Sequence, residues 1–258
     1  MITSTSNQKV REVKQLQKKS RLRNEQGVFI VEGIRMVREI PLAQIVQIYV
    51  SEEFYRKYRE ELPQGIKPEM VSSQVFAAMS DTKTPQGVLA VVRQSSYRIE
   101  EMLRDGQAQI LVLDNLQDPG NLGTIFRTAE AAGVTGIVMS SDCVDIYNPK
   151  TVRSTMGAIF RQPFVYVEEL TESISRMREG GVQVYAAHLE GKNTYDAEDY
   201  RGKTAFLIGN EGNGLRPQVA ACADSWVRIP MAGQAESLNA AVAAAILMFE
   251  VSRQRRTS

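Results

Sequence analysis

Residues 206–215 read Phe-Leu-Ile-Gly-Asn-Glu-Gly-Asn-Gly-Leu, and this stretch decides the fold. Phe206–Ile208 form an apolar, β-rich run that is typical of a strand buried on both faces. The three glycines in the next six residues allow left-handed backbone and expose N–H and C=O groups to a ligand. A strand that runs directly into such a loop indicates the ligand-binding edge of an α/β sheet, with Glu211 beside it. A tight turn with a solvent-facing Glu211 is the alternative, although one or two glycines usually suffice for a turn.

Similar apolar runs recur along residues 109–258, and helical patterns separate most of them. Buried strands that alternate with helices predict a parallel sheet in a three-layer α/β domain. An Ala-rich pattern over Leu238–Val251 predicts a final helix. The expected strands are Ile110–Leu113, Gly136–Met139, Phe164–Val167, Val182–Ala186, Ala205–Ile208 and Trp226–Ile229. Since folds of this class bind ligands at the carboxyl ends of their strands, we expect the site residues in the loops that follow the strands.

A smaller α/β unit precedes this domain. The spacing of Val10, Val13 and Leu16 predicts a helix over residues 6–20. We therefore predict an N-terminal domain over residues 1–95, a linker over 96–108 and a second domain over 109–258. The other elements expected in the first unit are strands at Gly27–Gly33, Val46–Val50 and Val88–Val92, and helices at Ile34–Ile40 and Glu52–Glu61.

The composition narrows the class of protein. The 258 residues are 43% hydrophobic and 24% charged, with a net charge of +1, which is typical of a globular protein. Crossing a bilayer takes about 20 consecutive apolar residues, and no stretch approaches that length. The N-terminus is polar and basic, unlike a secretory signal. Two cysteines and a single histidine argue against a disulfide framework and against a Cys/His zinc site. We expect a cytoplasmic protein without a metal or a membrane partner.

Basic residues gather at both ends of the chain. Clustered cations suit contact with phosphates, whereas a solvated helix face and a charged tail are the simpler alternative. The cations are Lys9, Arg11, Lys14, Lys18, Lys19, Arg21 and Arg23 at the N-terminus, and Arg253, Arg255 and Arg256 at the C-terminus.

A second informative segment, Asp114–Ala129, reads Asp-Asn-Leu-Gln-Asp-Pro-Gly-Asn-Leu-Gly-Thr-Ile-Phe-Arg-Thr-Ala. It predicts a strand end, a polar Pro-Gly turn and a helix that begins near Asn121. Arg127 follows six residues later, so both side chains can share one flank of the helix. Asn121 as a plain N-cap and Arg127 in a structural ion pair would explain the same residues, so the pattern alone leaves both interpretations open.

A third segment, Ile229–Val242, reads Ile-Pro-Met-Ala-Gly-Gln-Ala-Glu-Ser-Leu-Asn-Ala-Ala-Val. A strand ends, a loop follows, and either Ser237 or Asn239 is expected to open the final helix. Helix N-capping explains either residue. It does not explain Glu236, Ser237 and Asn239 together in front of a helix so rich in small residues.

Several common catalytic patterns are missing from the chain. No G-x-G-x-x-G follows a strand, which argues against a dinucleotide site. Gly202-Lys203-Thr204 resembles the end of a phosphate loop, but Ala197 occupies the position of the first glycine and the segment precedes a strand. No G-x-S-x-G elbow is present, so a Ser/His triad would have to use His188. His188 follows a strand, and a loop or half-buried histidine is the simpler interpretation.

In order and spacing, the three segments resemble the three motifs of the SpoU/TrmH methyltransferases of the SPOUT superfamily. Residues 114–129 resemble the N-x(5)-R motif, residues 206–215 the strand–G-x-E-G-x-G motif, and residues 229–242 the I-P-M…E-S-L-N motif. Residues 20–92 resemble the ribosomal-protein-like RNA-binding domain that is often fused in front. The resemblance implies an RNA ribose 2′-O-methyltransferase that uses S-adenosylmethionine, with a C-terminal trefoil knot in its parallel sheet.

The resemblance also implies roles for individual residues. By similarity, the cofactor would be contacted by Gly209, Ile229, Met231 and Leu238. The catalytic site would contain Arg127, Asn121, Glu211, Ser237 and Asn239. Because a guanidinium stays protonated in proteins, we expect Arg127 to orient the 2′-hydroxyl and neutralise a phosphate, and not to take the proton.

The partners follow from the same resemblance. A family member would be a homodimer in which the final helix and the first-motif helix pack across a two-fold axis. The small residues of Ala240–Ala245 suit close helix packing either between subunits or inside one. The fused N-terminal domain favours ribosomal RNA, and tRNA is the alternative substrate. A non-catalytic RNA-binding relative would be expected to lack Arg127, Glu211 or Asn239, and an unrelated α/β nucleotide-binding enzyme would be expected to carry a phosphate loop.

Overall fold

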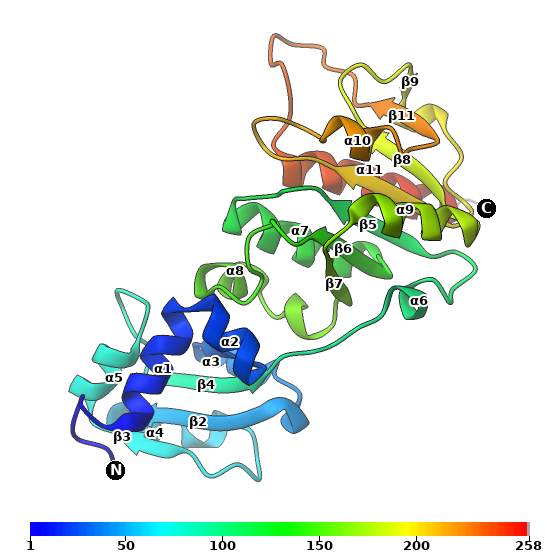
Figure 1. The fold of residues 1–258 in the computed structure, drawn as a ribbon. Helices are drawn as coiled ribbons and strands as arrows, with labels where there is room; N and C mark the ends of the chain where they lie inside the picture. Colours follow the sequence, from blue (N-terminus) through cyan, green and yellow to red (C-terminus); the bar gives the residue numbers. More distant parts are fainter. Residues whose placement is uncertain (257–258) are drawn as a thin grey trace. The chain divides into compact units, whose positions relative to one another are not determined.

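The structure, a computed structural model, describes residues 1–256 and divides into two compact units (Figure 1). The first unit consists of Met1–Ser95 together with Asp145–Phe160. The second unit consists of Ser96–Val144 and the chain from Arg161 onward. Within residues 1–256, no helix combines the length and the hydrophobicity that crossing a bilayer requires.

The second unit is built on a seven-stranded sheet with the order β7-β6-β5-β10-β8-β11-β9. Every neighbouring pair of strands in it is parallel, which confirms the predicted fold class. The central strands β5 and β10 pair from Thr204 with Gln109 to Ile208 with Leu113. The strands are β5 (Gln109–Leu113), β6 (Gly136–Ser140), β7 (Phe164–Val167), β8 (Gln183–Ala187), β9 (Asn193–Thr194), β10 (Thr204–Ile208) and β11 (Ser225–Arg228).

Helices cover both faces of this sheet and complete the three layers (Figure 1). On one face, Ile110, Val112 and Leu207 share a buried cluster with residues of α9 and α10. On the other face, α7 and α11 pack against each other, and the Gln109 side chain reaches the Met248 carbonyl oxygen at 3.4 Å. The helices of the unit are α6 (Ile99–Met102), α7 (Pro119–Ala132), α9 (Leu170–Glu179), α10 (Pro217–Ala220) and α11 (Ala240–Arg256), with a 3₁₀ turn at Tyr195–Ala197.

Two helix starts decide which side chains are available for binding. Helix α7 begins at Pro119, and the carboxylate of Asp118 accepts a hydrogen bond from the Asn121 backbone N–H at 2.8 Å. The N-cap is therefore Asp118, which leaves the Asn121 side chain free for other contacts. Helix α11 begins at Ala240 and is capped by Asn239, whose Oδ1 accepts from the N–H groups two and three residues on, at 2.9 and 3.3 Å.

The first unit contains a four-stranded sheet with the order β1-β4-β2-β3. Strand β4 is antiparallel to β1 and β2, whereas β2 and β3 are parallel. The strands are β1 (Val28–Glu32), β2 (Ile45–Ser51), β3 (Glu69–Val71) and β4 (Val88–Arg93). The helices are α1 (Gln8–Lys18), α2 (Ser20–Gln26), α3 (Ile34–Arg38), α4 (Glu52–Tyr58), α5 (Ser73–Met79) and α8 (Pro149–Ser154), with 3₁₀ turns at Leu42–Gln44, Arg59–Glu61 and Ala158–Phe160.

The connection between β6 and β7 supplies the last helix of the first unit. Its aromatic residues pack on β1, where the Phe29 ring lies 4.7 Å from the Tyr147 ring and 6.2 Å from the Phe160 ring, measured between centroids. The buried guanidinium of Arg23 forms an ion pair with Asp145 at the start of this connection. Residues 145–160 are thus held by a core and by a buried charge pair, and they are a structural part of the first unit.

Candidate functional site

Three loops of the second unit follow strands β5, β10 and β11, and they carry the three sequence segments singled out above. Because all the strands of this sheet are parallel, their carboxyl ends lie at the same edge. The loop after β5 leads into α7, and the loop after β11 leads into α11. The loop after β10 turns back on itself before α10 begins at Pro217. The fold therefore brings segments that are about a hundred residues apart in sequence to one place.

A chain of side-chain hydrogen bonds joins the three loops. Asn239 donates from Nδ2 to Oδ1 of Asn121 at 2.9 Å. Asn121 in turn donates from its own Nδ2 to Oε1 of Glu211 at 3.0 Å. In each amide the oxygen accepts and the nitrogen donates, so this series of hydrogen bonds fixes the orientation of both side chains. The structure brings Asn121, Glu211 and Asn239 together, one from each segment.

The Glu211 carboxylate fastens the loop after β10 to the loop after β5. Besides Asn121, it accepts hydrogen bonds from the backbone N–H groups of Gln117 at 3.1 Å and Asp118 at 2.9 Å. Burial pushes the pKa of Glu211 upward, but the hydrogen bonds from Asn121, Asp118 and Gln117 outweigh it and leave that pKa below the ordinary value of 4.5. Glu211 is thus held as a carboxylate that receives three donors.

The loop after β10 is a closed turn in which the first glycine is required by the chain itself. Asn210 and Gly214 exchange two backbone hydrogen bonds of 2.9 and 3.0 Å, and Gly214 has a φ of +68°. A Cβ atom on Gly209 would lie within 3.0 Å of the backbone of Gly214 and Leu215. Gly209 therefore allows the backbone of Gly214 and Leu215, in its own loop, to pack closely against it. This loop lines the cavity described below.

Asn210 ties this turn to the loop after β5. Its Nδ2 donates to the Asn115 carbonyl oxygen at 2.8 Å, and its Oδ1 accepts from the N–H groups of Gly212 and Asn213 at 2.9 and 3.1 Å. Asn115 has a φ of +53°, a left-handed conformation that asparagine tolerates better than most residues.

An ion pair anchors the far end of the same loop. Asp114, fully buried at the end of β5, accepts hydrogen bonds from the Arg216 backbone N–H at 2.8 Å and from its Nε at 2.7 Å. The Arg216 Nη1 also reaches Asp142 at 3.2 Å. A buried carboxylate needs such a partner, so the pair holds residues 209–216 against β5.

A cavity of about 320 Å³ lies at this edge, between the loops after β8, β10 and β11 and the first turns of α11. All four residues expected to contact a cofactor line it: Gly209, Ile229, Met231 and Leu238. Glu211 and Ser237 line it as well. Its wall is a mixture of apolar side chains and backbone groups, with the Glu211 carboxylate and the Arg228 guanidinium as charged elements. Such a cavity suits a small ligand that combines apolar parts with positive and negative groups.

His188 also lines this cavity. Its ring lies 4.2 Å from that of Trp226 between centroids, and its Nδ1 accepts the Glu190 backbone N–H at 3.1 Å. This leaves Nε2 as the ring nitrogen that can meet a ligand. The sequence placed His188 after a strand, where a loop histidine was the simpler interpretation, and nothing in the local pattern marks it as a cavity residue.

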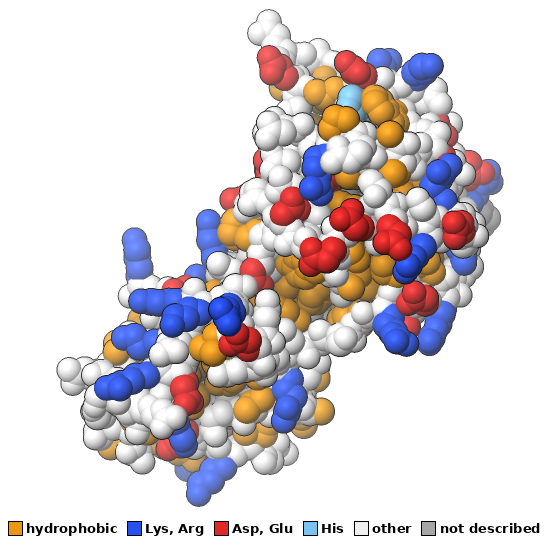
Figure 2. All heavy atoms as spheres, viewed as in Figure 1, with side chains coloured by type: hydrophobic (Ala, Val, Ile, Leu, Met, Phe, Trp, Pro, Cys, Tyr) orange, Lys and Arg blue, Asp and Glu red, His pale blue; other side chains and the backbone are white. Residues whose placement is uncertain are grey.

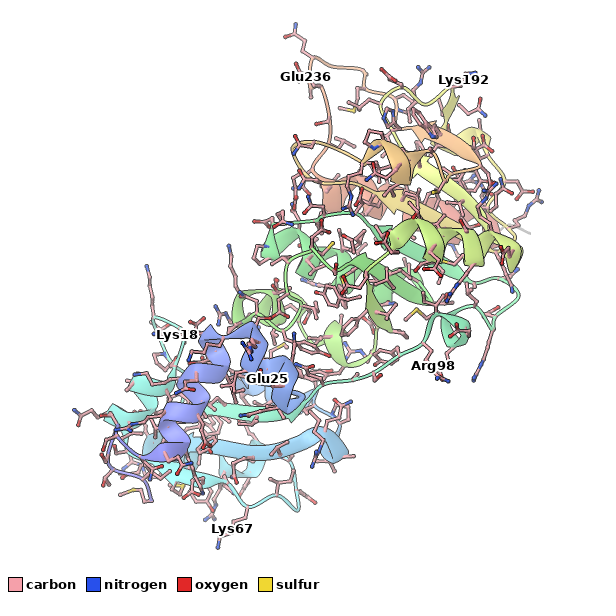
Figure 3. All side chains as sticks on the ribbon, in the orientation of Figure 1. Lys18, Glu25, Lys67, Arg98, Lys192 and Glu236 are labelled. Carbon is pink, nitrogen blue, oxygen red and sulfur yellow. The ribbon has the colours of Figure 1, made fainter. Side chains whose placement is uncertain are left out.

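Two of the expected catalytic residues lie apart from the hydrogen-bonded chain. Arg127 is exposed on α7 and makes no hydrogen bond or ion pair with any residue of the described part of the chain. Ser237 is exposed in the loop before α11, and its contribution to the site is the cavity wall. Glu236, which the sequence analysis named together with Ser237 and Asn239, is exposed on the outer part of that loop (Figure 3).

Sequence reasoning missed three parts of the site, namely the Asp114–Arg216 pair, the Asn210 brace and His188. Asp114 and Asn210 lie inside the quoted segments and Arg216 one residue beyond them, and a buried Asp directly after an apolar strand is the only hint of a partner. A search of residues 1–256 for three or more His, Cys, Asp or Glu side chains placed to hold a metal finds no such group.

Comparisons with known proteins show the family of the chain. The SpoU rRNA Methylase family model matches residues 108–249, and the MRM3-like substrate binding domain matches residues 7–90. The chain is 36% identical over 252 residues to 23S rRNA (guanosine(2553)-2'-O)-methyltransferase RlmP of Bacillus subtilis (strain 168), covering 97% of this chain and 98% of that protein.

Two solved structures extend these comparisons. The AdoMet-bound rRNA methyltransferase from Sinorhizobium meliloti superposes with a TM-score of 0.86 at 33% identity, covering 98% of this chain and 97% of the other. The A. aeolicus TrmH/SpoU tRNA modifying enzyme superposes with a TM-score of 0.53 at 27% identity, covering 61% of this chain and 80% of the other.

Proposed function

The chain belongs to the SpoU rRNA methylase family, and from this premise we propose that it transfers a methyl group from S-adenosylmethionine to a ribose 2′-hydroxyl of ribosomal RNA. The observation that carries the proposal is the joining of three sequence segments at one edge of the sheet. Two of them line the cavity, and the third is tied to them by the hydrogen bonds from Asn239 to Asn121 and from Asn121 to Glu211.

The cavity fits the proposed cofactor. Gly209, Ile229, Met231 and Leu238 would hold it, largely with backbone groups and apolar side chains. When bound, S-adenosylmethionine supplies a methyl group that its positive sulfur has already activated. Glu211 and Arg228 give the cavity wall one charged residue of each sign, which suits a ligand that carries a sulfonium and a carboxylate.

A ribose then has to be positioned next to the bound cofactor. We assign this task to Arg127, because its guanidinium is exposed on α7 and engaged by no other described residue, and is thus available to a phosphate and a hydroxyl. Glu211 has its oxygens occupied by three donors and a lowered pKa, so it is a weak base. Its proposed part is therefore to hold Asn121 and the two loops in place.

Ribosomal RNA is the proposed substrate, and tRNA is the alternative. The relative named for 23S rRNA matches along both units, whereas the tRNA modifying enzyme matches 61% of the chain. In the proposed division of labour, residues 1–95 bind RNA, residues 96–108 are the linker, and residues 109–258 carry out the transfer, except that residues 145–160 belong structurally to the first unit. We propose the cytoplasm as the location of this activity.

We also propose that the protein is a homodimer whose second unit contains a trefoil knot. Ala241 and Ala244 are buried inside the subunit, so the small-residue face of α11 is used within one chain. Val242 and Phe249 are 48% and 47% exposed, and their seven-residue spacing puts both on one face of α11. An exposed apolar stripe of this kind supports packing against a second copy. The molar mass measured by light scattering should be that of two chains for the wild type. For Phe249→Glu it should be that of one chain.

The test of the proposed activity uses S-adenosylmethionine with a labelled methyl group and deproteinised 23S ribosomal RNA, with total tRNA as the second substrate. We expect label in the ribosomal RNA, mapped to a ribose 2′-oxygen. Label on bases only, or no transfer by protein that binds the cofactor, would overturn the proposal. Transfer to tRNA alone would establish the alternative substrate.

Arg127→Ala tests the assigned residue in the same assay. Because Arg127 is exposed and unpaired within the described chain, its removal should change the free energy of unfolding by less than about 0.5 kcal/mol. We expect the kcat of methyl transfer to fall by roughly a hundredfold or more, as for loss of a group that acts in the transition state. A variant with unchanged kcat and only weaker RNA binding would remove Arg127 from the catalytic step.

A further inference from the structure

The first unit carries a cationic surface built from three segments that are distant in sequence. Lys18 ends α1, Lys83 lies in the loop between α5 and β4, and Lys150 and Arg153 belong to α8. We call these four side chains the α8 surface. Figure 2 shows Lys and Arg side chains gathered over the part of the unit that holds α1 and α2, and Figure 3 labels Lys18 at the end of α1.

Two contacts bring the three segments together. The Gln17 side chain donates from Nε2 to the carbonyl oxygen of Met79 at 2.7 Å, which fixes the end of α1 beside the end of α5. The Arg153 guanidinium donates from Nη1 to Oδ2 of Asp81 at 3.1 Å, which fixes α8 against the loop that follows α5. Lys18 adjoins the first contact in sequence, and Lys83 lies two residues beyond the second.

The loop between α5 and β4 is rigidly held at this point. The Glu32 side chain, 8% exposed at the end of β1, accepts hydrogen bonds from the Ser80 hydroxyl, from the Thr82 hydroxyl at 3.0 Å and from the Asp81 backbone N–H at 3.1 Å. Fixing these three residues presets the position of Asp81, and with it that of Arg153. A preorganised surface loses less conformational entropy when it binds a partner.

The charges on the α8 surface are left largely uncompensated. Asp81 is 45% exposed and is already paired with Arg153, whereas the Glu32 carboxylate is turned inward. Lys18, Lys83 and Lys150 are exposed and form no ion pair with any residue described in the structure. Cations that lack partners on one surface attract a polyanion.

We propose that the α8 surface binds the phosphate backbone of the RNA substrate, and that α8 is therefore a substrate-binding element. This inference rests on the proposed function and deepens it. The region matched by the substrate binding domain ends at residue 90, and α8 lies inside the region matched by the methylase family. Structurally, however, α8 belongs to the first unit, where its cations adjoin those of α1 and of the loop after α5.

The experiment measures binding of full-length protein to fluorescently labelled fragments that tile 23S ribosomal RNA, over a range of salt concentrations. The test variant is Lys18→Ala/Lys83→Ala/Lys150→Ala, which leaves the Arg153–Asp81 contact in place. Each lost phosphate contact should lower the slope of log Kd against log salt by about 0.7 to 0.9, so the triple variant should lose about 2 to 3. The KM for RNA should rise, while kcat at saturating RNA and the Kd for S-adenosylmethionine stay unchanged.

The matched control is Arg56→Ala/Arg59→Ala/Lys67→Ala. It removes three exposed cations of the same unit that also lack ion pairs among the described residues. Lys67 lies at the opposite end of the unit from Lys18 (Figure 3). An equal loss of slope in the control would attribute binding to net charge, and an unchanged slope in the test variant would exclude the α8 surface from binding. Either result would overturn this inference. If the wild-type protein still methylates RNA normally, the proposed function is unaffected. Absence of methyl transfer by wild-type protein would instead reject the proposed function.

Discussion

Asn239 both caps helix α11 and donates a hydrogen bond to Asn121 at 2.9 Å, so the start of the last helix is joined to the side chain that holds Glu211. The two roles use different atoms, because the cap uses Oδ1 and the link uses Nδ2. If Asn239 lost its donor, Asn121 could not restore the link by turning its amide group, because its oxygen would then face the Glu211 carboxylate. The link therefore has one direction and can be removed without removing the cap.

Asn239→Asp should separate these two roles. The aspartate keeps the oxygen that caps α11 but has no N–H to donate to Asn121. We expect the free energy of unfolding to change by less than about 0.5 kcal/mol in urea titrations, with at least a tenfold loss of methyl transfer. Asn239→Ala removes both roles and should cost about 1 kcal/mol of stability in addition. Equal activity of Asn239→Asp and wild type would show that the link is dispensable.

Two glycines of the loop after β10 should respond differently to the same added methyl group. Gly209→Ala places Cβ within 3.0 Å of the Gly214 and Leu215 backbone, so the loop must open and the cavity wall must shift. We expect a loss of about 1–3 kcal/mol of stability and weaker S-adenosylmethionine binding by calorimetry. At Gly212 the nearest atom to a Cβ is Asn210 Oδ1 at 3.6 Å, an ordinary contact. Gly212→Ala should therefore bind the cofactor nearly as wild type does, and equal losses in both variants would contradict this account.

The fold of the second unit could be predicted because its strands are buried on both faces and therefore appear as continuous apolar runs. Phe206–Ile208 and Ile110–Leu113 are such runs, and they became the paired central strands β10 and β5. Strand ends were less exact, since Ile229 was expected to end a strand that stops at Arg228. The short strand β3 and helix α5 went unnoticed because their apolar pattern is too brief to give a period.

The site was predictable to the extent that its residues cluster in sequence. Glycines near a strand end pointed to the loop at Gly209, and the resemblance selected Asn121 and Asn239. The ion-pair partners of the site residues could not be predicted in the same way, because Asp114 and its partner Arg216 are 102 residues apart in sequence. The packing of α8 on the first unit was hidden for the same reason, since only the tertiary structure pairs Arg153 with Asp81.

Arg216→Ala should destabilise the second unit far more than loss of an exposed ion pair. It leaves the fully buried Asp114 carboxylate with only a backbone donor. Because the Arg216 side chain is 39% exposed, we expect a cost of about 2–3 kcal/mol, below that of breaking a fully buried pair. Arg201→Ala is the matched control, because Arg201 and Asp199 are 59% and 61% exposed. Exposed pairs contribute about 0–1 kcal/mol. Urea unfolding compares the two variants, and similar losses would show that the Asp114 pair has no special role.

Cofactor binding should weaken in acid through Glu211. Burial works against its charge, but the donors from Asn121, Asp118 and Gln117 lower its pKa below 4.5 in the folded protein. A carboxyl with a depressed folded pKa contributes stabilisation that is complete above its unfolded pKa and is lost as the pH falls through the folded value. We therefore expect the contribution of Glu211 to the free energy of unfolding to be constant from neutral pH down to about 4.5 and to decline below it. Because the protonated side chain no longer holds the two loops as the carboxylate does, S-adenosylmethionine affinity should decline over the same range.

The single tryptophan gives a readout for this titration, since Trp226 stacks on His188 and His188 lines the cavity. Glu211→Gln is the control, because an amide cannot accept from all three donors and does not titrate. This variant should bind the cofactor more weakly at neutral pH and should lack the decline that Glu211 causes below about 4.5. If wild type and Glu211→Gln lose affinity in parallel as the pH falls, another group is responsible, and the carboxylate is not what holds the two loops together.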